Sequence, residues 1–186
     1  MFDFHMHSLV SFDGHDAAEQ MLRAAAERGL KEICFTDHID YFANTDKQDW
    51  VFDTAVYNGA YDRLTHDTVT IRRGMEFGLK PYNAPMLRED LKRREFDFVL
   101  GSIHFVDEKD VYYAEYWDGL TVFQAERRYL EETLNCVSIH DDFDVLAHLT
   151  YVAKPHCHPA PRPVPFDEHR EVIEEILKVL VAKGKG

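Results

Sequence analysis

The 186-residue sequence has few cysteines and no long apolar run. Its three cysteines, Cys34, Cys136 and Cys157, are far apart and form no CxxC pair, which argues against a disulfide framework and a thiolate zinc site. We therefore expect reduced thiols in the core. No apolar stretch approaches the roughly 20 residues that a membrane-spanning helix requires. The N-terminus also lacks the build of a signal peptide, so we expect a cytoplasmic protein with no membrane partner.

Basic residues are outnumbered by acidic ones. The chain has 21 Lys and Arg against 34 Asp and Glu, which gives a formal net charge of −13. Non-specific nucleic-acid binding depends on a basic surface, so we expect no nucleic-acid partner. Bound divalent cations would offset part of the negative charge. The length and the 45% hydrophobic content fit a single globular domain over residues 1–186.

Short apolar runs that are typical of strands alternate with amphipathic stretches that are typical of helices. The expected strands are residues 1–7, 31–36, 68–77, 96–105 and 144–150, and the expected helices are residues 16–29, 55–66, 84–95, 123–140 and 166–184. This alternation indicates βα units with parallel strands, which form either a doubly wound sheet or a barrel with external helices. In both arrangements functional side chains gather at the carboxyl ends of the strands.

Histidines or carboxylates stand at the end of every expected strand. In chain order they are His5 and His7, Asp37 and His38, Glu76, His104, and His148. Side chains two apart on a strand face the same side, so His5 and His7 can share one ion. Imidazole and carboxylate ligands suit zinc, iron or manganese, and the two oxygens of Glu76 can bridge two ions. Jointly, these positions predict a metal site at one rim of the sheet.

Further polar groups leave alternatives open. Asp13 and His15, in the loop after the first strand, can each reach an additional metal. The HCH motif at residues 156–158 looks like a second small metal motif, but it lies in a proline-rich loop. The remaining histidines are expected to be structural or on the surface, and they are His66, His140 and His169.

The motifs DFHMHSLVSFDG, TDH, GMEF, GSIH and VLAHLTY, in this order, resemble those of the PHP (polymerase and histidinol phosphatase) superfamily. The histidinol-phosphatase-type branch is the best match. The resemblance implies a distorted (β/α)7 TIM-like barrel with about two to three zinc, iron or manganese ions at the carboxyl rim. It implies the metal ligands His5, His7, Asp13, His38, Glu76, His104 and His148. It also implies catalytic roles for Glu76 as a bridging ligand and for Asp37, which would orient a ligand imidazole.

One superfamily motif is missing from the sequence. The superfamily pattern ends in a DxH motif on the final strand, and this chain has none. The barrel is therefore expected to be truncated after about five βα units. A barrel with open edges tends to pair with another chain, so we expect this chain to be either partnered, for example as a homo-oligomer, or incomplete.

The resemblance implies a metal-dependent phosphomonoesterase that acts on a small phosphate ester. The leading substrate is L-histidinol phosphate, in histidine biosynthesis. The alternatives are a PHP phosphoesterase with another small substrate and a metal-binding remnant without turnover. Lys154 and Arg162, beyond the fifth strand, are either phosphate anchors or solvated loop charges. The sequence does not identify the proton donor for the leaving alcohol.

Overall fold

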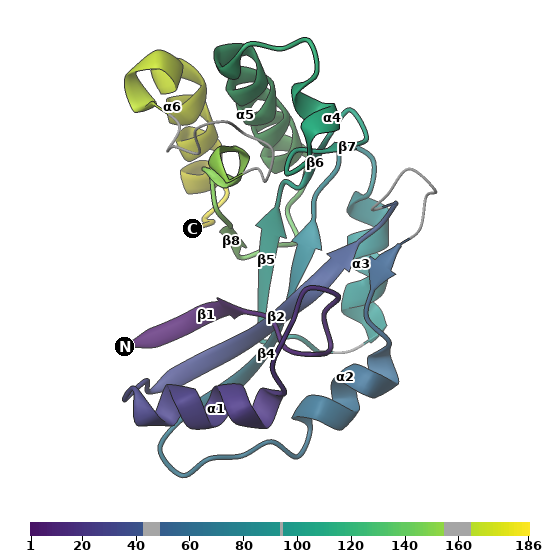
Figure 1. Cartoon of the computed structure of the whole chain (residues 1–186), viewed down its shortest axis with the longest axis vertical. Helices are drawn as coiled ribbons and strands as arrows, with labels where there is room; N and C mark the ends of the chain where they lie inside the picture. Colours follow the sequence, from purple (N-terminus) through teal and green to yellow (C-terminus); the bar gives the residue numbers. More distant parts are fainter. Residues whose placement is uncertain (43–48, 94, 155–164) are drawn as a thin grey trace.

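Five parallel strands form the centre of the protein. The structure is a computed structural model, and it describes residues 1–42, 49–93, 95–154 and 165–186. The strand order is β1 (Phe2–Met6), β2 (Glu32–Asp40), β4 (Thr70–Gly78), β5 (Phe98–Ser102) and β8 (Val145–Leu146). All neighbouring pairs along this path are parallel, and the sheet curls into part of a barrel (Figure 1). The predicted α/β fold with five parallel strands is confirmed.

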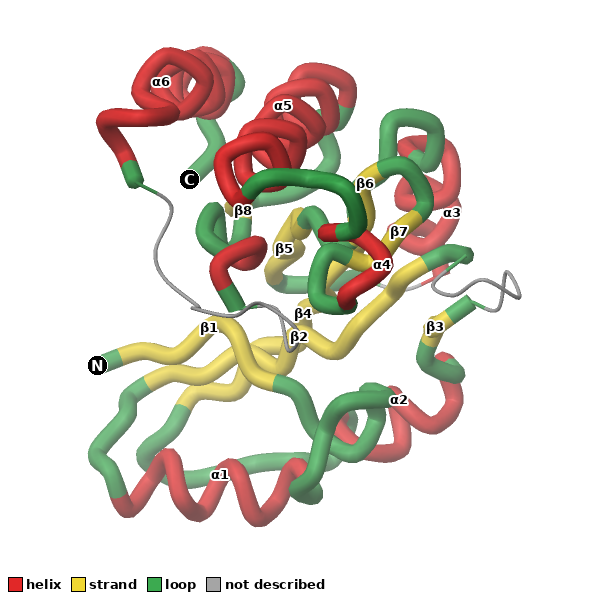
Figure 2. The backbone as a smooth tube through the Cα atoms, turned by 45° about the horizontal axis from the view of Figure 1, so that its top comes forward, coloured by secondary structure: helices red, strands yellow, loops and turns green. Residues whose placement is uncertain are grey.

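The main helices also follow the sequence pattern. They are α1 (Ala18–Glu27), α2 (Thr54–Tyr61), α3 (Ala84–Arg93), α5 (Val122–Ile139) and α6 (Phe166–Ala182). Helices α5 and α6 lie side by side, away from α1 and α2 (Figures 1 and 2). Gly29 follows α1 with a φ of 74°, a conformation that glycine adopts without the steric cost of a β-carbon.

The helices pack against the sheet through two clusters of buried apolar side chains. The cluster beneath α1 and α2 includes Leu22, Ile33, Phe35, Tyr57 and Tyr61. The cluster beneath α3, α5 and α6 includes Met75, Phe77, Leu87, Leu130 and Ile176. Full burial of such a side chain stabilises the fold by about 1.5–3 kcal/mol. Because strand side chains alternate, the residues between these core positions face the other side of the sheet.

Several short elements are absent from the sequence-based prediction. They are β3 (Trp50–Val51), β6 (Phe105–Val106), β7 (Lys109–Asp110), α4 (Ala114–Trp117) and the 3₁₀ turn η1 (Tyr151–Ala153). Strands β6 and β7 form an antiparallel hairpin directly after His104. Its turn residues, Asp107 and Glu108, have φ values of 50° and 60°. Because this turn contains neither glycine nor asparagine, the sequence carries little signal for a hairpin.

The cysteines behave as core residues where the structure describes them. Cys34 and Cys136 are free and buried, as predicted, and Cys157 lies outside the described residues. Among the helices that the structure describes, none has the length and apolar character needed to cross a membrane.

Candidate metal centre

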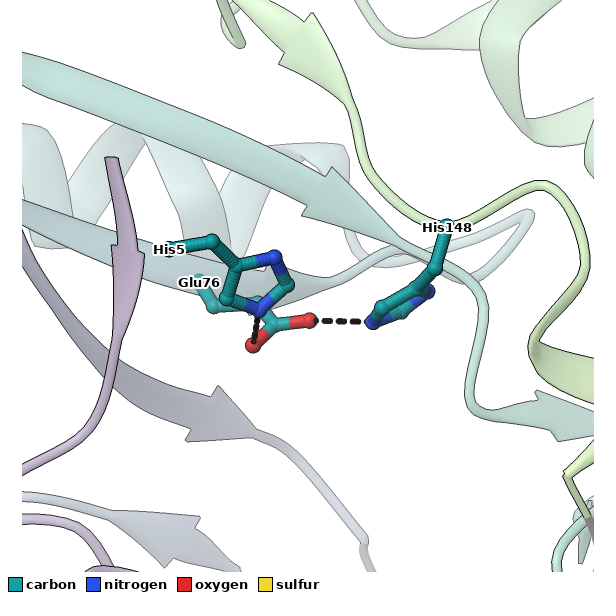
Figure 3. A group of neighbouring side chains, drawn as sticks. All are labelled: His5, Glu76 and His148. Atoms are coloured by element: carbon teal, nitrogen blue, oxygen red, sulfur yellow. Dashed lines mark hydrogen bonds and ion pairs between the residues drawn. The ribbon is translucent and has the colours of Figure 1, made fainter. Parts of the chain in front are cut away.

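Five histidine side chains surround one carboxylate, that of Glu76. Glu76 lies near the end of β4 and is fully buried. One oxygen, Oε1, lies 2.9 Å from Nε2 of His148 and 3.2 Å from Nε2 of His104. The other, Oε2, lies 2.8, 3.2 and 3.5 Å from Nε2 of His5, His7 and His38. Figure 3 shows His5, from β1, and His148, from the segment after β8, reaching the two oxygens of Glu76.

Strand register explains part of this convergence. His38 of β2 pairs with Glu76 of β4, so the two side chains leave the sheet as neighbours. Ser102, at the end of β5, donates a hydrogen bond of 2.5 Å to Oε1 of Glu76. Burial works to raise the pKa of Glu76, but its hydrogen bonds to the surrounding histidines hold that pKa well below the ordinary value. Glu76 is therefore a fixed anion at the centre of the cluster.

Asp40 is a part of the site that the sequence analysis missed. Its Oδ2 lies 3.0 Å from Nδ1 of His38, and its Oδ1 lies 2.9 Å from Nδ1 of His104. Burial works to raise the pKa of Asp40, but His104 and His38 hold it well below the ordinary value. A carboxylate on Nδ1 fixes the ring so that Nε2 faces the cluster. The signal was in the sequence, because Asp40 follows His38 by two residues and so shares its face of β2.

Asp37 does not have the predicted role. Its carboxylate accepts a hydrogen bond of 2.8 Å from the backbone N–H of Ser8 and another from the hydroxyl of Tyr61. Asp37 is adjacent to His38 on the strand, so its side chain leaves the opposite face, towards α2. Among the described residues, the carboxylate that bonds imidazoles of the predicted ligands His38 and His104 is that of Asp40 and not that of Asp37. Asp37 instead anchors the loop after β1, the loop that carries Asp13.

Asp13 approaches the cluster from that loop. Its Oδ2 lies 3.4 Å from Nε2 of His38. Burial works to raise the pKa of Asp13, but the hydrogen bond to His38 and the charge of that ring lower it to about 2. His15, the alternative loop ligand, is exposed and does not line the cavity over the cluster.

A cavity of about 680 Å³ lies over the cluster, a volume typical of small-molecule sites. Its lining residues are His5, His7, Phe12, Asp13, His38, Asp40, Trp50, Glu76, His104, Asp110, Tyr112, Tyr113, His148, Tyr151 and Lys154. All the predicted metal ligands are among them, and so is the candidate phosphate anchor Lys154. The other candidate anchor, Arg162, lies outside the described residues, as does the HCH motif at residues 156–158.

The donor set fits divalent metal ions. Three groups of three side chains each have their potential ligand atoms within 4.8 Å of one another. The first group is His5, Glu76 and His148, the second is His7, His38 and Glu76, and the third is His38, Asp40 and His104. The Nδ1 atoms of His7 and His148 are buried without a hydrogen-bond partner in the described part of the chain, while their Nε2 atoms face Glu76. Imidazoles crowded in this way around carboxylates match the ligand preference of zinc, iron and manganese.

The histidines expected to be structural lie outside the cluster. His140 donates from Nε2 to the carbonyl oxygen of Lys80 at 2.8 Å, and His169 lies 3.2 Å from Glu126 between α5 and α6. His66 is exposed beside Thr68.

The sequence pattern of the PHP domain family matches residues 3–186. The chain belongs to the PHP domain family. It is 29% identical over 195 residues to the histidinol-phosphatase of Lactococcus lactis, in an alignment that covers 99% of this chain and 69% of that protein. It is 28% identical over 181 residues to a probable histidinol-phosphatase of Clostridium acetobutylicum, in an alignment that covers 97% of this chain and 69% of the relative.

Solved structures place this PHP domain among the barrels of the family. The crystal structure of the Lactococcus lactis histidinol phosphate phosphatase, with zinc, L-histidinol and phosphate, matches with a TM-score of 0.93 at 29% identity. That match covers 99% of this chain and 70% of the relative. A Listeria monocytogenes protein described as a putative histidinol phosphatase shares the fold, with a TM-score of 0.73 at 17% identity. The predicted superfamily, TIM-like barrel class and phosphoesterase enzyme class are confirmed by these matches.

Proposed function

We propose that this PHP domain is a metal-dependent phosphomonoesterase whose substrate is L-histidinol phosphate, as in histidine biosynthesis. The observation that carries the proposal is the arrangement around Glu76, where each carboxylate oxygen faces histidines beneath a cavity of about 680 Å³. The substrate assignment draws on the Lactococcus lactis relative, which was solved with L-histidinol, phosphate and zinc.

Divalent ions would be held by residues that already converge. They are His5, His7, Asp13, His38, Glu76, His104 and His148. When bound, such ions supply positive charge to phosphate oxygens and lower the pKa of a water molecule. Zinc is supported as the bound metal by the Lactococcus lactis structure, which contains zinc. We include iron and manganese in the proposal, and we propose that about two to three ions are bound per chain.

The chain's own groups contribute orientation and charge. Asp40 holds the rings of His38 and His104, and Ser102 holds the carboxylate of Glu76. Lys154 is exposed at the cavity and brings positive charge to it. A lysine in this position stabilises a phosphate dianion by direct attraction. Lys154 would therefore bind the phosphate group while the cluster residues fix the reacting end.

The test is phosphate release by the full chain, after incubation with zinc, manganese or iron and with metal content measured by elemental analysis. The substrates are L-histidinol phosphate, a nucleoside monophosphate and p-nitrophenyl phosphate. We expect more than about one metal per chain and the highest kcat/KM on L-histidinol phosphate. Glu76→Gln is the inactive control, and His15→Ala is the control that should retain activity.

Each alternative function has its own result. A higher kcat/KM on another ester would indicate a PHP phosphoesterase with a different substrate. Bound metal without hydrolysis of any ester would indicate a metal-binding remnant. Either result would contradict the proposed substrate.

A further inference from the structure

One acidic side chain of the cavity is not among the predicted metal ligands. Asp110 ends β7 and lines the same cavity as the cluster. Its Oδ1 accepts a hydrogen bond of 2.8 Å from the backbone N–H of Tyr112. Among the described residues, no lysine, arginine or histidine side chain forms an ion pair with Asp110. The cavity therefore contains a carboxylate with room for a cation from outside the protein.

Partial burial destabilises the charged form of the Asp110 carboxylate. It raises the pKa of Asp110, because the charged form is less well solvated there than in water, and this outweighs the Tyr112 N–H and the more distant charges of His104 and His38. An ammonium group in the cavity would offset that cost through a charge-assisted hydrogen bond.

Aromatic rings line the same cavity, and the ring of Trp50 lies 6.5 Å from that of Phe105, the residue that pairs with Asp110. The rings of Phe12 and Trp50 are 4.1 Å apart between centroids, and those of Tyr112 and Tyr113 are 5.3 Å apart. Phe12 and Tyr113 are 55% and 47% exposed, so much of their apolar surface is available to a ligand. Aromatic faces attract cations and stack on flat rings. The cavity that contains Asp110 therefore suits an organic group that is both flat and positively charged.

The hairpin holds Asp110 in place through contacts that do not involve its carboxylate. Asp110 pairs with Phe105 across the hairpin. The buried Lys80 donates from Nζ to Oε2 of Glu108 at 3.0 Å, and Nζ lies 4.6 Å from the centroid of the Phe105 ring. These contacts fix the turn. A change of charge at Asp110 should thus leave the fold and the metal ligands in place.

We propose that Asp110 binds the ammonium group on the alcohol part of the substrate and makes the enzyme selective for phosphate monoesters of amino alcohols. This inference rests on the proposed function, because it assigns the end of the substrate that is not the phosphate. The aromatic wall of Phe12, Trp50 and Tyr112 would contact the flat ring of the same group.

The experiment compares two esters that differ only in the ammonium group. They are L-histidinol phosphate and its deamino analogue, imidazolylpropyl phosphate, assayed with the zinc-loaded protein. Asp110→Asn keeps the acceptor for the Tyr112 N–H but removes the charge. Asp107→Asn, at the tip of the same hairpin, makes the same charge change outside the cavity and is the matched control.

We expect Asp110→Asn to lower kcat/KM for L-histidinol phosphate by about 10- to 100-fold, the worth of one charge-assisted hydrogen bond. Most of this loss should appear in KM, and kcat/KM for the deamino ester should change by less than about twofold. L-Histidinol should also inhibit the variant more weakly than the wild type. Asp107→Asn should match the wild type on both esters.

Equal losses on both esters, or no loss on either, would overturn the assignment of Asp110 while leaving the phosphatase in place. A wild-type protein that hydrolyses p-nitrophenyl phosphate but does not prefer the amino ester would overturn it as well. Failure to hydrolyse any ester would instead overturn the proposed function, and the role of Asp110 would fall with it.

Discussion

Oε1 of Glu76 lies 2.9 Å from Nε2 of His148, although the two residues are 72 positions apart in the chain. Glu76 comes from β4 and His148 follows β8, so the contact reaches across β5, which lies between these two strands in the sheet (Figure 3). The other oxygen of Glu76 meets His5 from β1 on the opposite side. The Glu76 carboxylate thus contacts side chains from both ends of the strand order, and it holds the histidines of the cluster together.

Glu76→Gln should therefore weaken metal binding strongly and abolish activity. The amide removes the negative charge from the centre of five imidazoles. We expect zinc affinity to fall by more than about 100-fold, because loss of an outer partner alone costs about 10- to 100-fold. Calorimetric titration with zinc measures the affinity. His15→Ala, on the exposed loop, should bind zinc as the wild type does. If the two variants bound zinc equally, Glu76 would not be the central ligand.

Asp40→Asn should weaken metal binding without unfolding the chain. Asp40 bonds Nδ1 of both His38 and His104, so its charge orients two ligand rings together. We expect zinc affinity to fall by about 10- to 100-fold. Asp37→Asn, on the other face of the same strand, should mainly lower the free energy of unfolding. The same titration and urea unfolding distinguish the two. A larger loss of zinc affinity in Asp37→Asn would reverse the roles assigned to these residues.

Gly78→Ala should reproduce the effect of Asp40→Asn by steric means. A β-carbon at Gly78 would lie 1.9 Å from Oδ1 of Asp40, so the carboxylate would have to move away from the ligand rings. Because both changes disturb the same contact, the double variant should bind zinc about as weakly as either single variant. Gly59→Ala in α2, where the new β-carbon meets nothing within 4 Å, is the control. Independent, additive losses in the double variant would contradict this account.

Zinc binding should release protons at pH 8. In the metal-free protein, nearby carboxylates outweigh burial and raise the pKa of His38 to about 11 and of His104 to about 10. Both rings are then protonated at pH 8, whereas a metal binds only the neutral imidazole. We expect release of up to about two protons per chain. Calorimetric titration in two buffers of different ionisation enthalpy measures the number. A binding heat that is the same in both buffers would contradict the prediction.

The same shifts set the pH dependence of stability in the metal-free protein. The folded pKa values of His38 and His104 lie above the ordinary value of 6.5. Their contribution to the free energy of unfolding is therefore fully present below pH 6.5, and it is lost as the pH rises towards 10 and 11. Urea unfolding of the metal-free chain between pH 6.5 and 10 should show a falling free energy. A constant value over this interval would show that the two rings are neutral when folded.

Local patterns in the sequence were sufficient for the framework and for most of the residues that converge on Glu76. Alternating βα segments specify parallel strands, and His5, His7 and His148 stand at strand ends that a parallel sheet must bring to one rim. Both are properties of local periodicity and of connection rules, so they can be derived without coordinates.

Tertiary structure decided which acidic residues serve the site. Asp37 and Asp40 are close in sequence, yet one bonds Tyr61 and the other bonds two ligand rings. Asp110 reaches the cavity only because a hairpin without glycine folds back after His104. The alternation of side chains along β2 already puts Asp40 on the face of His38 and Asp37 on the other face. Which face meets the helix, and how far apart distant segments lie, are determined by packing, and no local sequence pattern encodes these.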